Sequence, residues 1–399
     1  MQRKDDTKDI STIYMRKTPA LLNAQMLYLF YYMALGSFMP FISLYFARLG
    51  LTGVQIGTLA AFPVLINIST SLFWSGVADV LHWHRRILRI ALFLSPVAIF
   101  FLSRVSSMAL LIPIVIVYAL FSSPIVPLLD SFALETATEN RRTYGDLRLW
   151  GSVGWAISTV LIGWLIERSG IRWLFYGYIS FMGFTLFASL FQPKRRKMLK
   201  TSIWTGLKEL LGHKSFLLFL FSIFLLTITS SGVLTFFSIY MDSIGTKEGL
   251  IGLGWALSAI SEIPVMILSG KVINKIGSKG LLVIAFILFA VRWMLFSFIH
   301  APFLALVVQL LHGPSFASFL VGSVTYIHER TPEGLNTTAL SIFNIVTYGL
   351  GTMVGSLLGG ALLDQVGMDV LFRVFSLIAA VSFFFFLAGQ RVSLKAENI

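Results

Sequence analysis

The sequence predicts an all-α membrane protein of twelve transmembrane helices in two pseudo-symmetric six-helix bundles. Composition is the first reason: 56% of the 399 residues are apolar and only 12% are charged, against about 25% charged residues in soluble domains. Apolar stretches of about 20 residues, enough to cross a bilayer, also follow one another along almost the whole chain. Finally, a polar, basic stretch follows the second apolar span of each half, at 75–86 and 270–279, which indicates an internal duplication.

The first half, residues 1–192, contains six apolar spans with short loops between them. Gly36 and Pro40 interrupt the first span, which is rich in Tyr and Phe. The six spans are expected at residues 21–46, 56–80, 87–102, 108–133, 147–166 and 173–191.

The second half, residues 215–399, repeats this arrangement after a basic linker at 193–214, which carries a short amphipathic piece at 203–211. Its spans are expected at residues 216–240, 250–268, 280–299, 303–327, 339–363 and 370–388. We expect each half to form one bundle.

The charge distribution predicts the orientation in the membrane. Most Lys and Arg residues fall in the termini and in the loops after even-numbered spans, so the positive-inside rule places both termini in the cytoplasm. The opposite side carries only Arg48, Arg104, Arg168, Arg172, Lys247 and Arg373. The net charge of +13 therefore reflects topology, in what we expect to be a bacterial inner membrane, and not a nucleic-acid partner.

Several classes of function are disfavoured. The chain has no cysteine, which excludes disulfides and thiolate metal sites, and it has no phosphate-binding Walker loop. We therefore expect no metal, no cofactor, no ATP-driven step and no enzymatic activity.

Small residues collect on spans 2, 5, 8 and 11, as in the glycine-rich stretches 151–163 and 351–360. Small side chains let helix backbones approach closely. Tight packing explains any single glycine, but recurrence at the same ordinal spans of both halves favours an interface between the halves. Charges at span ends, Glu135, Glu167, Arg168, Asp364 and Arg373, are interpreted as solvated loop charges.

The two basic stretches resemble the signature loop of the major facilitator superfamily, G-x-x-x-D-[RK]-x-G-x-[RK]. The second copy matches this pattern, with an Asn at the acidic position, through Gly270, Asn274, Lys275, Gly277 and Lys279. The first copy has Ser75 and His82 in place of the glycines and keeps Asp79, Arg85 and Arg86.

The resemblance implies a conformational latch formed by these residues. An acidic side chain near a helix end can hold a neighbouring helix through charge-assisted hydrogen bonds and so stabilise one access state of a bistable bundle. Alternatively, the basic residues of both copies only fix topology. Asn274 lacks the charge, which favours Asp79 as the latch.

A finer resemblance covers most of the chain. Span 5 begins YGDLRLWGSVGWA, which is similar to the span-5 entry of lactose permease and of its phenylpropionate-permease-like and nucleoside:proton symporter relatives. Asp130, Arg148 and Trp155 have the order and spacing of a carboxylate, an arginine and a sugar-stacking Trp in lactose permease. The resemblance implies that these three residues bind substrate.

In the second half, EIPVM, VRW and QLLHGPSFASF resemble the phenylpropionate-permease-like branch. The resemblance implies proton coupling through Glu262, Arg292 and His312. Lactose permease has a further Glu where this chain has Ser315, so neither lactose as substrate nor its protonation site is carried over. Either Glu262 or His312 can be the proton carrier.

The intramembrane charges support this interpretation independently. A charge at the centre of a membrane helix costs roughly 2.5–3.5 kcal/mol, so such groups face water or each other. The sequence therefore predicts a monomeric, proton-coupled symporter that takes up a small organic solute, such as a sugar, a nucleoside or an aromatic monocarboxylate, by alternating access. The alternatives are proton-linked efflux of amphipathic compounds and a non-transporting membrane receptor or scaffold.

Overall fold

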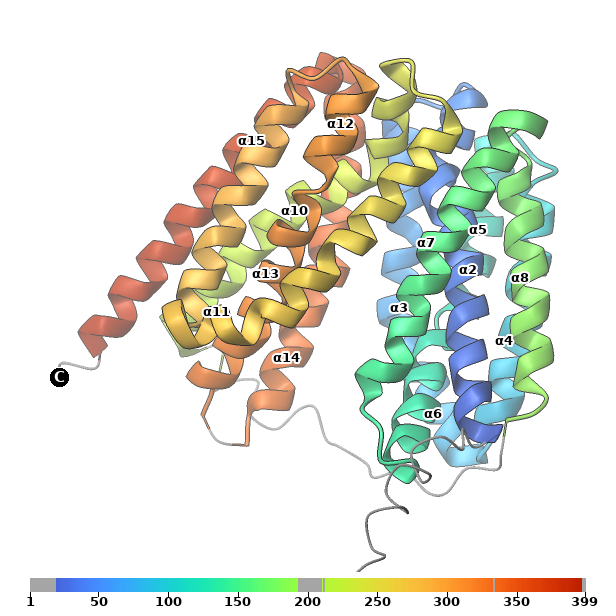
Figure 1. Ribbon diagram of the computed structural model, residues 1–399, viewed down its shortest axis with the longest axis horizontal. Coiled ribbons are helices and arrows are strands. Elements are labelled where there is room, and N and C mark those ends of the chain that lie inside the picture. Colours follow the sequence, from blue (N-terminus) through green and yellow to red (C-terminus); the bar gives the residue numbers. More distant parts are fainter. Residues whose placement is uncertain (1–18, 193–209, 211, 333, 397–399) are drawn as a thin grey trace, which may run out of the picture.

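The computed structural model describes residues 19–192, 210, 212–332 and 334–396. The N-terminal bundle lies on one side of the molecule (Figure 1). Its helices are α2 Pro19–Arg48, α3 Gly53–Leu81, α4 His84–Leu102, α5 Met108–Ser122, α6 Ile125–Glu139, α7 Tyr144–Ser169 and α8 Trp173–Ser189.

The C-terminal bundle lies beside it. Its helices are α10 Lys214–Ser243, α11 Glu248–Phe296, α12 Pro302–Gln309, α13 His312–Arg330, α14 Asn336–Asn344, the π-helix η1 Ile345–Gly351 and α15 Thr352–Ala396. Apart from Leu210, the amphipathic piece expected at 203–211 lies outside the described residues, as does most of the linker.

Two of the long helices each contain two membrane spans, because a glycine turns the chain in the middle. Gly277 in α11 has φ 72° and Gly367 in α15 has φ 79°, a left-handed region that favours glycine. Seven helical segments of the described chain are long and apolar enough to cross a membrane, and the consecutive helices α5 with α6 and α12 with α13 each form one of them. Dividing α11 and α15 at these glycines, and adding the shorter or more polar α3, α4 and α8, gives the twelve predicted spans.

Three spans are not the continuous α-helices that the hydropathy pattern predicts. Pro124 separates α5 from α6, and Pro314 follows the break between α12 and α13. A proline has no N–H and its ring clashes with the carbonyl four residues earlier. Span 11 contains η1, a wider helical turn of a kind that is frequent at functional sites.

The two basic stretches were expected to be loops, and this expectation is wrong for most of their length. α3 continues to Leu81 and α11 continues past Gly270, so the chain leaves helical geometry only at His82 (φ 55°), Trp83 and Gly277. Hydropathy reports where the hydrocarbon core ends, whereas backbone hydrogen bonding continues beyond it.

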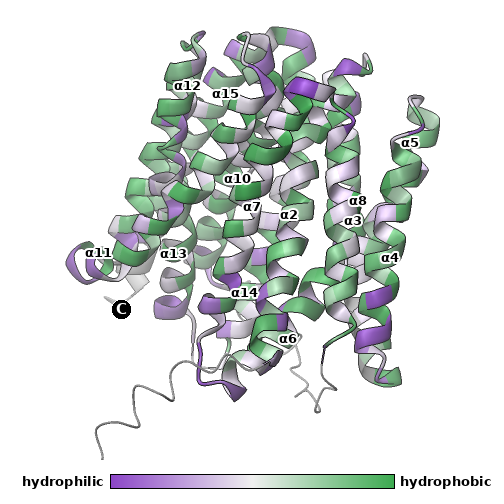
Figure 2. Cartoon of the chain, turned by 45° about the vertical axis from the view of Figure 1, so that its right-hand side comes forward, coloured by the Kyte–Doolittle hydropathy of each residue, from purple (hydrophilic) through white to green (hydrophobic). Residues whose placement is uncertain are grey.

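The two bundles meet at one end of the molecule and diverge at the other (Figure 1). We call the first the closed end; it contains the last turns of α2 and α7 and the first turns of α3 and α11. The second, the open end, contains α6 and α14. Apolar residues cover the long sides of both bundles (Figure 2), as expected for sides that face lipid.

Small residues form the contact between the bundles. A Cβ atom at Gly57 of α3 would overlap the carbonyl oxygen of Ser356 in α15, and one at Gly252 of α11 would overlap that of Thr159 in α7. The predicted interface of spans 2, 5, 8 and 11 is therefore confirmed, with span 2 against span 11 and span 5 against span 8.

Candidate functional site

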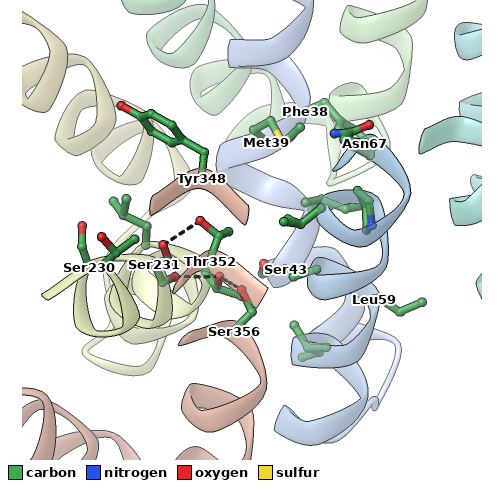
Figure 3. A pocket seen from close by; sticks show the side chains of 18 of the residues that line it. Phe38, Met39, Ser43, Leu59, Asn67, Ser230, Ser231, Tyr348, Thr352 and Ser356 are labelled. Atoms are coloured by element: carbon green, nitrogen blue, oxygen red, sulfur yellow. Dashed lines mark hydrogen bonds between the residues drawn. The ribbon is translucent and has the colours of Figure 1, made fainter. Parts of the chain in front are cut away.

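A cavity of about 460 Å³ lies between the two bundles (Figure 3). One wall comes from α2 and α3, and the other from α10, η1 and the first turns of α15. Trp255 of α11 and Phe316 of α13 contribute aromatic surface. Among the described residues that line the cavity, there is no Lys, Arg, His, Asp or Glu.

A row of hydroxyl groups runs along the C-terminal wall of this cavity. Ser231 Oγ lies 3.1 Å from Thr352 Oγ1, and one helical turn further Thr235 Oγ1 lies 3.0 Å from Ser356 Oγ (Figure 3). These four residues, here called the hydroxyl ladder, join α10 to the start of α15. The cavity therefore combines apolar walls with one polar edge.

Asp130 lies away from the cavity, on α6. The hydroxyl of Tyr28 in α2 donates a hydrogen bond of 2.5 Å to Asp130 Oδ1. Tyr28 precedes the first cavity-lining residue of α2, Phe38, by ten residues, which is about 15 Å along a helix axis. Since α2 begins at the open end, the Asp130 site lies between the cavity and that end.

Arg148 and Trp155 of α7 also lie outside the cavity lining. The Arg148 guanidinium sits 4.3 Å from the centre of the Tyr32 ring, a cation–π geometry. Within the described residues, no ion pair of 4.0 Å or less joins Arg148 to Asp130. Trp155 packs edge-to-face at 6.2 Å on Trp255, a cavity-lining residue of the other bundle.

The structure brings Glu262, Arg292 and His312 together in one hydrogen-bonded chain. His312 Nε2 lies 3.1 Å from Glu262 Oε1, and His312 Nδ1 lies 2.9 Å from Arg292 Nη1. The chain continues from Arg292 Nη2 to Gln309 Oε1 at 2.7 Å, and from Gln309 to Ser258. Because the His312 ring stacks on Phe316 at 5.3 Å, the network is one side chain away from the cavity.

The donor and acceptor roles in this chain fix the state of His312. Arginine has no acceptor, so the bond from Arg292 requires a lone pair on His312 Nδ1. His312 is then neutral, and its Nε2–H donates to Glu262. Exposure rises along the chain: Arg292 is 0% exposed, while the side chains of His312 and Glu262 are 7% and 23% exposed. Glu262 is therefore the end that water can reach.

The residues of the expected latch lie near the open end. In the C-terminal copy, Asn274 and Lys275 are exposed just before the Gly277 turn in the middle of α11, and the Ser278 hydroxyl donates to Glu329 of α13. In the N-terminal copy, Arg85 and Arg86 begin α4, with Arg86 5.3 Å from the Trp83 ring. The side chain of Asp79 lies outside what the structure describes.

Two carboxylates hold the bundles together at the closed end. Asp364 at the end of span 11 accepts bonds from Gly53 N at 2.5 Å and from Val54 N at 2.8 Å, the first backbone N–H groups of α3. In the pseudo-symmetric position, Glu167 at the end of α7 accepts from Gly249 N, in the first turn of α11, at 3.3 Å.

Ion pairs reinforce these contacts. Arg48 of α2 lies 2.7 Å from both Asp242 and Glu248, and Lys247 lies 3.6 Å from Glu167. The interpretation of Glu167 and Asp364 as merely solvated loop charges is therefore wrong. The sequence could not show this, because their partners lie in the other bundle.

The hydroxyl ladder was also missed. A signal for it exists: Thr227, Ser231 and Thr235 recur every four residues in span 7, and Thr352 and Ser356 do so in span 11. This spacing places the hydroxyls on one helix face.

Two six-helix bundles that face each other across a central cavity place this protein among the major facilitator transporters. The family model described as "MFS_1 like family" matches residues 21–374, and the chain belongs to that family.

Relatives and solved structures agree with this assignment. The chain is 27% identical to the maltose permease of Geobacillus stearothermophilus over 88% of this chain and 91% of the permease. It is also 27% identical to the probable 3-phenylpropionic acid transporter of Escherichia coli (strain K12), over 90% and 94% of the two chains. The crystal structure of the nucleoside transporter NupG shares the fold, with a TM-score of 0.80 at 17% identity, over 94% of this chain and 99% of that one.

Proposed function

We propose that this protein is a proton-coupled symporter that takes up a small organic solute by alternating access. The observation that carries the proposal is the buried chain from Arg292 through His312 to Glu262, which ends in one partly exposed carboxylate beside the central cavity. Relatives named as maltose, phenylpropionic acid and nucleoside transporters support the solute class.

Glu262 is the proposed proton carrier. In this conformation His312 receives a hydrogen bond at Nδ1, so it cannot take a proton there unless Arg292 moves away. Glu262 has no such obstacle, because a protonated carboxyl group can still accept the bond from His312 Nε2. Arg292 and His312 then act as positioning residues that respond to the charge on Glu262.

The orientation of the protein in the membrane determines which side the cavity faces. The positive-inside rule places the open end in the cytoplasm, in a membrane that we propose to be the bacterial inner membrane. The cavity then faces inward, and the carboxylate contacts at the closed end form the outer gate. The bundles 1–192 and 215–399 are the proposed moving units of a monomer, joined by the 193–214 linker.

Asp130, Arg148 and Trp155 have roles along the inward path. The polar surface of Asp130 and Arg148 lies between the cavity and the open end, where a solute leaves for the cytoplasm. Trp155 does not line the cavity, but its ring contacts Trp255, whose ring does, so that its effect on the solute is indirect. We propose that Asp79, Arg85 and Arg86, and in the second copy Gly270, Asn274, Lys275, Gly277 and Lys279, latch the open end when it closes.

Transport into proteoliposomes tests the proposal. With an inward proton gradient, radiolabelled uridine, maltose or 3-phenylpropionate should accumulate, and a protonophore should abolish the accumulation. Glu262→Gln should lose uphill accumulation yet keep counterflow exchange, since a neutral side chain still permits the conformational change. Glu139→Gln, an exposed position on α6, is the matched control. Accumulation that survives the protonophore would refute proton coupling.

A second candidate function is proton-linked efflux of amphipathic compounds. The apolar, aromatic cavity lining favours it. Efflux predicts that cells expressing the protein tolerate such compounds better and accumulate less of them, whereas symport predicts greater accumulation.

A further inference from the structure

The hydroxyl ladder has every hydrogen committed. The hydroxyl of Thr235 donates to the Ser231 carbonyl at 2.8 Å, so the bond between Thr235 and Ser356 must be donated by Ser356. Thr352 donates to the Thr347 carbonyl at 3.2 Å, so Ser231 must be the donor in its bond to Thr352. Each hydroxyl carries one hydrogen and two lone pairs. While these bonds to the protein are kept, the ladder presents lone pairs to a solute.

The ladder is therefore an acceptor edge. Its two rungs, the hydroxyl pairs Ser231–Thr352 and Thr235–Ser356, are separated by about one helical turn, or about 6 Å along the axis. A solute can use both rungs only if it brings its own O–H or N–H donors. A carboxylate, which has no donor, would instead point its oxygen atoms at these lone pairs.

The rest of the described lining offers an anion neutral hydroxyl and amide donors, such as Ser43 and Asn67, but no positive charge. No described lining residue carries a positive charge. Arg148 is directed to the Tyr32 ring and Arg292 is fully buried behind Phe316. Asn67 and Ser43 on the opposite wall are neutral (Figure 3). An ion moved from water into such a site loses several kcal/mol of hydration without a partner charge.

The apolar part of the lining suits a ring. Trp255, Phe316 and Tyr348 bring aromatic surfaces from three helices to one cavity, and such surfaces stack on planar or apolar rings. Tyr348 belongs to the π-helix η1 (Figure 3).

We propose that the cavity selects uncharged solutes that combine an apolar or planar ring with at least two hydrogen-bond donors, such as nucleosides or glycosides, and that it rejects monocarboxylate anions. This inference rests on the proposed transport function, because it names the substrate class of the same cavity. It removes the aromatic monocarboxylate from the three classes that the sequence left open.

Binding to the purified full-length protein in detergent tests this directly, by titration calorimetry at pH 7. The probes are uridine, maltose, 3-phenylpropanol and 3-phenylpropionate, of which the last two differ only in the alcohol and carboxylate. We expect uridine or maltose, which have at least two donors, to bind more tightly than 3-phenylpropanol, which has one. We expect 3-phenylpropanol in turn to bind at least tenfold more tightly than 3-phenylpropionate, which has no donor and carries a charge. Binding of 3-phenylpropionate as tight as that of the alcohol, or binding of no neutral probe, would overturn the proposal.

Variants of the hydroxyl ladder test whether these hydroxyl groups bind the neutral solute. Thr352→Val and Ser231→Ala each remove an acceptor from the edge and should weaken binding of the best neutral probe about two- to tenfold, the range of a single hydrogen bond. Thr185→Val is the matched control, because Thr185 is buried on α8 with the same kind of bond to a backbone carbonyl, outside the cavity. Equal losses in the control and in both ladder variants would contradict the assignment.

Proton-coupled symport and the neutral substrate class can be refuted separately. Calorimetry requires no proton gradient and no transport. If the neutral probes bind as described but are not accumulated with protons, symport is wrong and the substrate class stands. If 3-phenylpropionate is bound and accumulated with protons, symport stands and the substrate class is wrong.

Discussion

Substitution of Asp364 by Asn should open the closed end. The carboxylate accepts from the first two N–H groups of α3, which have no partner within their own helix. Asn keeps one acceptor oxygen, but its NH₂ group faces the second N–H, so one bond and the charge are lost. Because Asp364 is exposed, we expect the lower range for a charged hydrogen bond at a helix N-terminus, about 1–2 kcal/mol, or a 5–30-fold shift toward the outward-open state.

Cysteine labelling measures this shift without background, because the chain contains no cysteine. Ser43 lines the cavity and is 8% exposed, so Ser43→Cys should react slowly with a membrane-impermeant maleimide added from the closed-end side. Adding Asp364→Asn should accelerate the reaction about 5–30-fold. Glu167→Gln should have a smaller effect, because its bond to Gly249 N is longer, at 3.3 Å.

The control is Asp369→Asn, the same change on the same helix. Asp369 pairs with His300 of its own bundle at 3.4 Å and makes none of the contacts between the bundles described above. If Asp364→Asn labels no faster than Asp369→Asn, the carboxylate contacts do not hold the outer gate, and the reasoning is refuted.

Three single contacts, at Gly57, His312 and Tyr28, can each be disrupted by one substitution. Gly57→Ala places a methyl group against a carbonyl of the other bundle and should also accelerate labelling at Ser43→Cys, whereas Gly183→Ala, with open space around it, should not. His312→Phe removes one of the two hydrogen-bond acceptors of the buried Arg292, whose other acceptor is Gln309, and should lower stability by about 1–3 kcal/mol, which a lower melting temperature would show. His312→Gln, which can accept and donate, should restore most of it. Tyr28→Phe removes the donor to a carboxylate and should slow solute exchange in counterflow assays; unchanged exchange would argue against a role for that site.

Much of the fold followed from the sequence because lipid imposes simple rules on it. Span length, the paired halves and the glycine positions on spans 2, 5, 8 and 11 all follow from the need to satisfy the backbone in hydrocarbon and to pack helices closely. The association of Glu262, Arg292 and His312 was also anticipated, since buried charges must find partners. Helix ends and breaks were less accurate, because hydropathy does not report the backbone geometry around Pro124 or Gly277.

What the tertiary structure alone decided are the contacts between the two bundles and the wall of the cavity. In the sequence, Asp364 and Glu167 cannot be told from solvent-facing loop residues. Only the contact between the two bundles brings their carboxylates to the N-termini of α3 and α11. The ladder from Ser231 to Ser356 exists only because α10 and α15 lie side by side. The sequence by itself determined which residues cannot face lipid. Which of them meet, and which lone pairs they present to a solute, depends on distances between helices that are remote in the chain.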